Sequence, residues 1–506
     1  MRQVSTCLIF IKTRTQAIQK LPAYLCNTTK QVFTSNQLPM KKSLMFIVGV
    51  ALSLTLHAQG NFTTKDHGFV HKASQKYEWP TDPEVLKKLD QWQDQKFGIM
   101  FHWGVYSVPG ISESWALCSE DRFTKRRKRI RPDATYDEFK NWYWGLAQSF
   151  NPIKFEPAEW AQIMKDAGFK YLIFTTKHHD GFCMFDSKYT DYNIAKGPYK
   201  NGKYSNVAYH LFDAFRKQGF MIGAYFSKPD WHCPYYWDPA LATPTRDMNY
   251  DITKYPETWK KFQQYTANQI DELMSDYGSI DILWLDGGWV RKPKQDIKLD
   301  EIIDKAREKQ PGLITVDRTI PGRNENYQTP ELTIPKEQQL HPWESNITLS
   351  NSWGWNPNPK LKSAEWVINT LAEITAKGGC FALNVGPTGD GVIEEKVIQR
   401  LKTVGKWLKK NGEAIYATRP TPNYHCGNVW FNASKDGKTL YAIYALPEGE
   451  ELPQYIEWEG NEPKGKMTLL QNGKSIQYTY EDGKVRMALP QGLKKEALAF
   501  KFKTAK

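Results

Sequence analysis

Residues 81 to 415 alternate short apolar runs with amphipathic stretches, and this alternation constrains the fold more than any other feature of the sequence. Such a pattern is typical of repeated β/α units around a parallel sheet. The expected strands are Phe97–His102, Tyr171–Thr176, Met221–Phe226, Ile280–Leu285, Leu313–Val316 and Phe381–Val385. No glycine-rich nucleotide fingerprint follows the first of them, so we expect a (β/α)8-like, TIM-type barrel rather than an open doubly wound sheet.

After Tyr416 the apolar runs become shorter and alternate with polar residues. Tight-turn dipeptides such as Asn472-Gly473 and Asp482-Gly483 separate these runs, as in antiparallel hairpins. We therefore expect a barrel over 60–415 and a C-terminal antiparallel β-sandwich over 416–506. The expected role of the sandwich is to buttress the barrel.

The N-terminal 58 residues have the features of a leader. Met40 is followed by two lysines, an apolar stretch from Leu44 to Leu56 and the small residue Ala58, which is the pattern of a secretory signal peptide. We expect 1–39 to lie upstream of the true start and 40–58 to be cleaved, so that the mature protein is exported to the periplasm or the extracellular space. The apolar stretch has 13 residues, fewer than the roughly 20 that span a bilayer, so no membrane span is expected in the mature chain.

The formal net charge of +13 overstates the basic character of the mature protein, because the leader holds seven Lys or Arg residues and no Asp or Glu. One basic run remains at Lys125–Arg131, with six cationic residues in seven. We interpret it as a solvated surface loop, the alternative being a grip on an anionic or sulfated glycan. The run lacks interleaved aromatic residues, so no nucleic-acid partner is expected.

Five of the seven cysteines follow the leader, and none of them forms a CxxC or zinc-type spacing. They are best interpreted as scattered small apolar residues. The sequence leaves open whether two of them form a disulfide in an oxidising compartment.

Polar residues stand where four of the expected strands end, which is where barrel enzymes carry their catalytic groups. The first strand ends at His102, the second is followed by His178 and His179, the third carries Tyr225 near its end, and the fourth ends at Asp286. Aromatic residues accompany these positions, and rings beside polar groups suit a sugar, which has apolar faces and an equator of hydroxyls.

Less specific interpretations exist for the same residues. Asp286 precedes two glycines and would serve equally well as a turn residue. His178 and His179 could be metal ligands, but neighbouring strand residues point to opposite faces and no HExxH spacing is present. We therefore expect neither a metal nor another cofactor.

Several motifs together resemble the α-L-fucosidases of glycoside hydrolase family 29. They are KFGIMFHWGVYSVP, FTTKHHDGF, LWLDGGW, VDR, the PWE and SWGW segments, and ALNVGPTGDG followed by WLKKNGEAIY. The resemblance covers about residues 85 to 418. It implies a (β/α)8-like barrel with a C-terminal β-sandwich, no metal, and exo-acting, retaining hydrolysis of terminal α-L-fucose from a fucosylated oligosaccharide or glycoconjugate.

The resemblance also implies roles for individual residues. Asp286 matches the catalytic nucleophile, and Glu344 matches the general acid/base, with Glu331 and Glu337 as nearby competitors. Glu113 is one place out of step with the family's Ser-Glu-Trp segment and receives no role. The expected fucose-binding residues are His102, Trp115, His178, His179, Tyr225, Trp284 and Arg318.

Three other functions remain open on the sequence alone. The nearest is a related retaining glycosidase that acts on a galactose-configured sugar. The others are a non-catalytic glycan-binding protein and a metal-dependent hydrolase that uses the two adjacent histidines.

Overall fold

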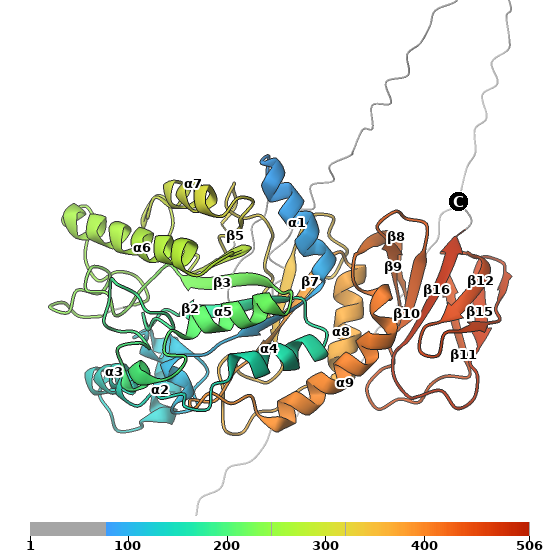
Figure 1. Cartoon of the computed structure of the whole chain (residues 1–506), viewed down its shortest axis with the longest axis horizontal. Coiled ribbons are helices and arrows are strands. Elements are labelled where there is room, and N and C mark those ends of the chain that lie inside the picture. Colours follow the sequence, from blue (N-terminus) through green and yellow to red (C-terminus); the bar gives the residue numbers. More distant parts are fainter. Residues whose placement is uncertain (1–76, 244, 319, 505–506) are drawn as a thin grey trace, which may run out of the picture. The chain divides into compact units, whose positions relative to one another are not determined.

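The structure is a computed structural model that describes residues 77–504 except residues 244 and 319 (Figure 1). The predicted signal peptide at 40–58 and the segment before it lie outside the described residues. Within the described part, no helix is long and apolar enough to cross a membrane.

The N-terminal part alternates parallel strands and helices, as the sequence pattern predicts. Its strands are β1 (Phe97–Phe101), β2 (Tyr171–Lys177), β3 (Met221–Ser227), β4 (Ile282–Asp286), β5 (Ile314–Val316), β6 (Glu344–Thr348) and β7 (Cys380–Val385). Its helices are α1 (Pro83–Gln95), α2 (Asp121–Ile130), α3 (Tyr136–Gly145), α4 (Pro157–Asp166), α5 (Val207–Lys217), α6 (Pro256–Asp276), α7 (Leu299–Lys309), α8 (Ala364–Ala376) and α9 (Glu395–Asn411).

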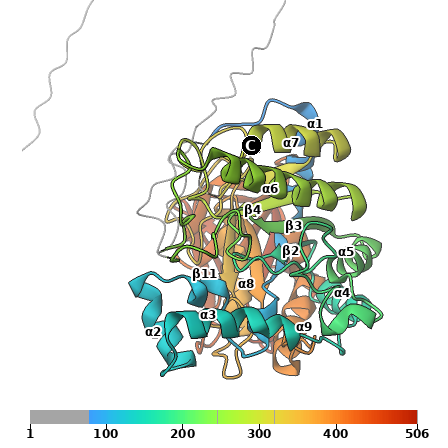
Figure 2. The same ribbon diagram turned by 90° about the vertical axis from the view of Figure 1, so that its left-hand side faces the viewer.

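The seven strands form one curled parallel sheet in the order β5-β4-β3-β2-β1-β7-β6. Almost all of their residues are buried, as expected of a parallel sheet that is covered on both faces. Helices α5, α6 and α7 lie outside strands β2, β3 and β4 (Figure 2). The fold is the predicted barrel with a C-terminal β domain. Strand β6 is the one element of this sheet that the apolar pattern did not reveal, since its sequence ESNIT is mostly polar.

An irregular segment, residues 326–331, lies between the two edge strands β5 and β6 in place of an eighth strand. On one side the backbone N–H of Asn326 donates to the carbonyl of Thr315 in β5, at 2.9 Å. On the other side Gln328 forms a parallel bridge with Trp343, and Glu331 forms one with Asn346 in β6. The segment therefore connects the edges of the sheet and brings Glu331 to the barrel.

The basic run lies largely in a helix, which corrects its interpretation as a surface loop. Helix α2 is held by two side chains: Phe123 stacks on Trp115 with ring centroids 4.9 Å apart, and the buried Arg127 donates to the carbonyl of Cys118. These contacts anchor one face of the helix, while Lys125 and Arg129 are exposed.

Antiparallel strands begin at Thr418 and fill the rest of the chain. They are β8 (Thr418–Cys426), β9 (Val429–Ser434), β10 (Leu440–Tyr444), β11 (Tyr455–Glu459), β12 (Pro463–Leu469), β13 (Lys474–Ile476), β14 (Thr479–Glu481), β15 (Lys484–Ala488) and β16 (Leu498–Thr504). They form a six-stranded and a three-stranded sheet that share one apolar core, in which Trp458 of the smaller sheet meets Phe431 and Phe502 of the larger.

The β domain is tied to the barrel by buried hydrogen bonds. The Asn432 side chain donates to Thr375 in α8 at 3.1 Å, and the Trp407 indole in α9 donates to the carbonyl of Ala497 at 2.8 Å. This contact supports the predicted buttressing role. All five cysteines of the described part are free, and four of them are buried.

Candidate functional site

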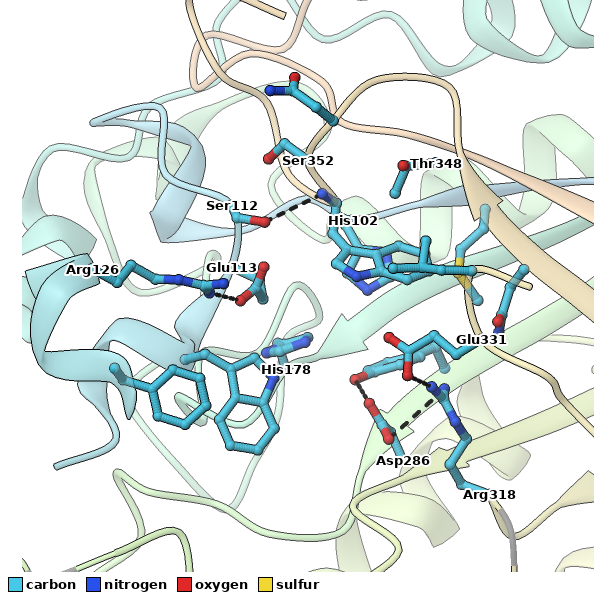
Figure 3. Close-up of a pocket in the computed structure, with 18 of the residues that line it drawn as sticks. His102, Ser112, Glu113, Arg126, His178, Asp286, Arg318, Glu331, Thr348 and Ser352 are labelled. Carbon is cyan, nitrogen blue, oxygen red and sulfur yellow. Dashed lines mark hydrogen bonds and ion pairs between the residues drawn. The ribbon is translucent and has the colours of Figure 1, made fainter. Parts of the chain in front are cut away.

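A cavity of about 540 Å³ opens at the carboxyl ends of the barrel strands (Figure 3). This volume is within the range of about 300 to 1,000 Å³ that is usual for small-molecule sites. Seven of the residues predicted for the site line it: His102, Trp115, His178, Tyr225, Trp284, Asp286 and Arg318. His179 lies next to the cavity without lining it, and Glu344 is not among its lining residues.

Asp286 is the last residue of β4, and its carboxylate is held from several sides. One oxygen accepts a hydrogen bond from the Tyr225 hydroxyl at 2.6 Å, and the other lies 3.9 Å from the Arg318 guanidinium and accepts from the backbone N–H of Gly287 at 2.7 Å. His179 Nε2 is 3.7 Å from the first oxygen. The Tyr225 hydroxyl, the Gly287 N–H and the Arg318 guanidinium stabilise the ionised carboxylate and fix its orientation in the cavity.

The three histidines of the site are uncharged. Burial lowers the pKa of His102 and of His179 to about 4, and that of His178 well below its ordinary value. The amide of Asn384 donates to the carbonyl of Trp353, so its oxygen accepts from His102 Nδ1 at 2.7 Å. This contact leaves His102 Nε2 unprotonated, as an acceptor that suits a hydroxyl donor.

Aromatic rings form much of the remaining wall. Trp284 stacks on Tyr225 with ring centroids 5.2 Å apart, and the ring centroids of Trp353 and His102 are 4.8 Å apart. Trp115 stands beside His179, 5.1 Å away between ring centroids. Flat apolar surfaces beside neutral polar groups are the combination that a pyranose ring requires.

A second carboxylate, Glu331, lies in the same cavity. Its oxygen accepts a hydrogen bond at 2.5 Å from Arg318, the same guanidinium that faces Asp286. Desolvation and the nearby charge of Asp286 raise the pKa of Glu331 above its ordinary value, although Arg318 opposes the shift. The cavity therefore holds one carboxylate stabilised as an anion and a second with a greater tendency to hold a proton.

The position of Glu344 contradicts its predicted role as general acid/base. It is the first residue of β6, fully buried, and accepts hydrogen bonds from the Tyr171 hydroxyl at 2.7 Å and from the Trp284 indole at 3.3 Å. Tyr171 begins β2, so Glu344 lies toward the amino ends of the strands, whereas Asp286 ends β4. Burial raises the pKa of Glu344 to about 7, but this carboxyl group has no access to a leaving group in the cavity.

Glu113, to which the family resemblance assigns no role, lines the cavity. It is almost fully buried, and its carboxylate pairs with Arg126 of α2. Glu113 directly precedes the short 3₁₀ helix η3 (Ser114–Leu117), which also positions Trp115. In the sequence, only its acidic side chain, two residues before the predicted binding residue Trp115, pointed to a place in the site. The side-chain direction at this turn depends on the tertiary structure.

Three potential metal ligands come together at the cavity. Ligand atoms of His178, His179 and Asp286 lie within 4.8 Å of one another. The Nδ1 atoms of His178 and His179 are engaged by Ser114 at 2.5 Å and by Ser227 at 2.7 Å, so a metal could be bound only through Nε2. The Arg318 guanidinium, however, already faces the Asp286 carboxylate. A cation beside Arg318 would meet direct electrostatic repulsion, so the position of this guanidinium favours a sugar site over a metal site.

Comparisons with known proteins are consistent with a glycan-binding cavity. A family model described as alpha-L-fucosidase matches residues 67–413. An alpha-L-fucosidase from Branchiostoma floridae is 28% identical over 382 residues, which are 71% of this chain and 79% of that protein. Among solved structures, alpha-L-fucosidase isoenzyme 1 from Paenibacillus thiaminolyticus is 26% identical, with a TM-score of 0.70 and coverage of 84% of this chain and all of that one. The Thermotoga maritima alpha-fucosidase in complex with fucose is 28% identical, with a TM-score of 0.66 and the same coverage.

Proposed function

Because this chain belongs to the α-L-fucosidase family and is a glycoside hydrolase, we propose that it releases terminal α-L-fucose from glycans by retaining, double-displacement hydrolysis. The observation that carries this mechanism is the pair of carboxylates, Asp286 and Glu331, that contact one guanidinium in a single cavity. Retaining enzymes need two carboxyl groups close together, whereas inverting enzymes leave room for a water molecule between them.

Asp286 acts as the nucleophile in this proposal. Its ionised oxygen attacks the anomeric carbon of fucose, and the bond to the glycosidic oxygen breaks to give a covalent fucosyl-enzyme. Tyr225 and Arg318 orient the carboxylate for this attack through the contacts at 2.6 and 3.9 Å. Water then attacks the same carbon from the opposite side, so that the configuration is retained overall.

Glu331 acts as the general acid and then as the base, in place of Glu344. The first step requires a protonated Glu331, which gives its proton to the departing oxygen, and desolvation and the charge of Asp286 favour this form by raising the pKa of Glu331. Formation of the covalent intermediate removes the charge of Asp286, which lowers the pKa of Glu331. The resulting carboxylate accepts a proton from the attacking water.

The sugar preference rests on the walls of the cavity and on the relatives. The neutral acceptor His102 Nε2 suits a sugar hydroxyl, while Trp284 and Trp353 provide apolar surfaces for ring faces and for the C6 methyl group of fucose. The Thermotoga maritima relative, solved in complex with fucose, supports the same sugar. We also propose that the leader directs export of the enzyme.

The decisive test compares Glu331→Gln with Glu337→Gln, an exposed carboxyl group outside the cavity that serves as the matched control. Loss of the general acid should lower kcat/KM by about 10²- to 10⁴-fold on fucosides with poor leaving groups, and by much less on activated aryl fucosides. The control should behave as wild type on both. Equal losses on both substrate types in the Glu331 variant would mean that another group is the acid.

The nucleophile is tested by Asp286→Gly. Free L-fucose, separated by chromatography from a panel of differently linked fucosylated oligosaccharides, should appear with wild type and not with the variant. Azide or formate should restore turnover of an aryl fucoside by occupying the vacated space. Undiminished fucose release by the variant would refute the assignment, and release of a different sugar by wild type would favour the galactose-type alternative.

A further inference from the structure

Helix α2 brings a row of cationic side chains to the mouth of the cavity. Arg122, Lys125, Arg126 and Arg129 all line it, and all four come from this one helix. Three of these residues lie in the turns that follow Phe123, whose ring is stacked on Trp115 of the cavity wall. The contact with Trp115 fixes the helix against the site, so that its cationic side chains lie at the cavity and not on a remote surface.

Two of the four cations already have a carboxylate partner. Arg122 pairs with Glu120 at 2.9 Å, and Arg126 pairs with Glu113. For Lys125 and Arg129, by contrast, the structure records no carboxylate within 4.0 Å among residues 77–504, leaving aside 244 and 319. Both side chains are exposed, so two positive charges at the edge of the cavity lack an anionic partner in the described part of the chain.

Helix α2, which carries these charges, lies on the side of the cavity away from the proposed reaction centre. Figure 3 shows Arg126 and Glu113 across the cavity from Asp286 and Arg318. The fucose ring must sit against Asp286 for attack, and the remainder of the glycan must extend from there toward solvent. The exposed face of α2 is therefore positioned beside the leaving group and not beneath the fucose ring.

We propose that Lys125 and Arg129 bind an anionic group, a sulfate ester or a carboxylate, on the glycan next to the fucose that is removed. This inference rests on the proposed fucosidase function and adds the charge class of its substrate. Lysine and arginine both bind oxyanions through charge-assisted hydrogen bonds, and at an exposed rim these contacts also draw the charged substrate toward the site.

The test uses three fucosylated oligosaccharides with the same core and linkage: one neutral, one with a sulfate ester on the sugar next to fucose, and one with a carboxylate there. Wild-type kcat/KM should be about five- to tenfold higher on at least one anionic substrate than on the neutral one. The preference should fall as NaCl is raised from 20 mM toward 1 M, because the Debye length shrinks to about 3 Å. The anionic substrate with the larger increase in kcat/KM identifies whether a sulfate ester or a carboxylate is bound.

The variant Lys125→Gln/Arg129→Gln should bring the ratio of anionic to neutral kcat/KM close to one. The matched control is Lys128→Gln, which removes a lysine charge from an exposed position on the same helix. The Lys128 ammonium group donates to the carbonyl of Pro132 at 2.8 Å and does not line the cavity. The control should keep the wild-type ratio.

Equal wild-type rates on neutral and anionic substrates would overturn the inference, as would a preference that survives in the double variant or is insensitive to salt. The salt series needs no variant, so it decides the matter even if the double variant folds poorly. Failure of wild type to release fucose from any substrate, an activated aryl fucoside included, would instead refute the proposed function.

Discussion

The buried carboxyl group of Glu344 should make the stability of this protein depend on pH, and Glu344→Gln should remove that dependence. In the folded protein the group lies beneath Trp284 with no exposed surface, and burial raises its pKa from 4.5 to about 7. In the unfolded chain it titrates near its ordinary value. The two states therefore bind different numbers of protons between about pH 4.5 and pH 7.

The sign follows from which state holds the proton. Below pH 4.5 both states are protonated, and Glu344 contributes no penalty. As the pH rises toward 7 the unfolded state loses its proton first, so the folded state is progressively destabilised, and above pH 7 the full penalty applies. A shift from 4.5 to about 7, at about 1.4 kcal/mol per pKa unit, corresponds to about 3 kcal/mol. For a unit of roughly 430 residues this is about 3 °C in Tm.

The assay is thermal unfolding of wild type, Glu344→Gln and the exposed control Glu337→Gln at closely spaced pH values from 4 to 8.5. Glutamine can still accept from the Tyr171 hydroxyl, although its amide adapts less well to the Trp284 indole, so a constant offset in Tm is expected. The informative quantity is the difference in Tm between wild type and variant, which should change by about 3 °C across this range. A difference that does not vary with pH, or the same variation in the control, would refute the reasoning.

Further outcomes follow from other contacts. Tyr225→Phe should lower kcat/KM about tenfold without loss of folding, because it removes one 2.6 Å hydrogen bond to Asp286; unchanged kinetics would mean that this bond does not position the nucleophile. Lys177→Met should destabilise the protein by about 3 to 5 kcal/mol, measured by urea unfolding, since it leaves Asp230 buried without its 3.0 Å partner. Activity should fall as the pH rises through the raised pKa of Glu331, and Glu331→Gln should lose this alkaline limb on an aryl fucoside. EDTA should leave the rate unchanged, and inhibition that zinc reverses would revive the metal-dependent alternative.

Local patterns in the sequence were sufficient for the parallel strands that carry the site. Strands β1, β2, β3 and β7 are largely apolar because both faces of the sheet are covered, and this makes them visible without any knowledge of the fold. Asp286 could be singled out for the same reason, since a charged residue that ends such a run must stand at the carboxyl edge of the barrel. Strand β6 escaped detection because its sequence ESNIT is mostly polar, although it is buried.

Only the tertiary structure could decide between the carboxylates that follow. Glu331 and Glu344 are close in sequence and both are buried, yet a segment that replaces a strand carries Glu331 to the cavity, while Glu344 begins β6 at the other end of the barrel. Similarly, the sequence shows that the run at 125–131 is basic but not that it lies at the cavity, because the position of α2 depends on the stacking of Phe123 on Trp115. Periodicity is a property of neighbouring residues and can be read from the sequence. The side of the barrel that an irregular segment reaches depends on contacts between residues far apart in the chain.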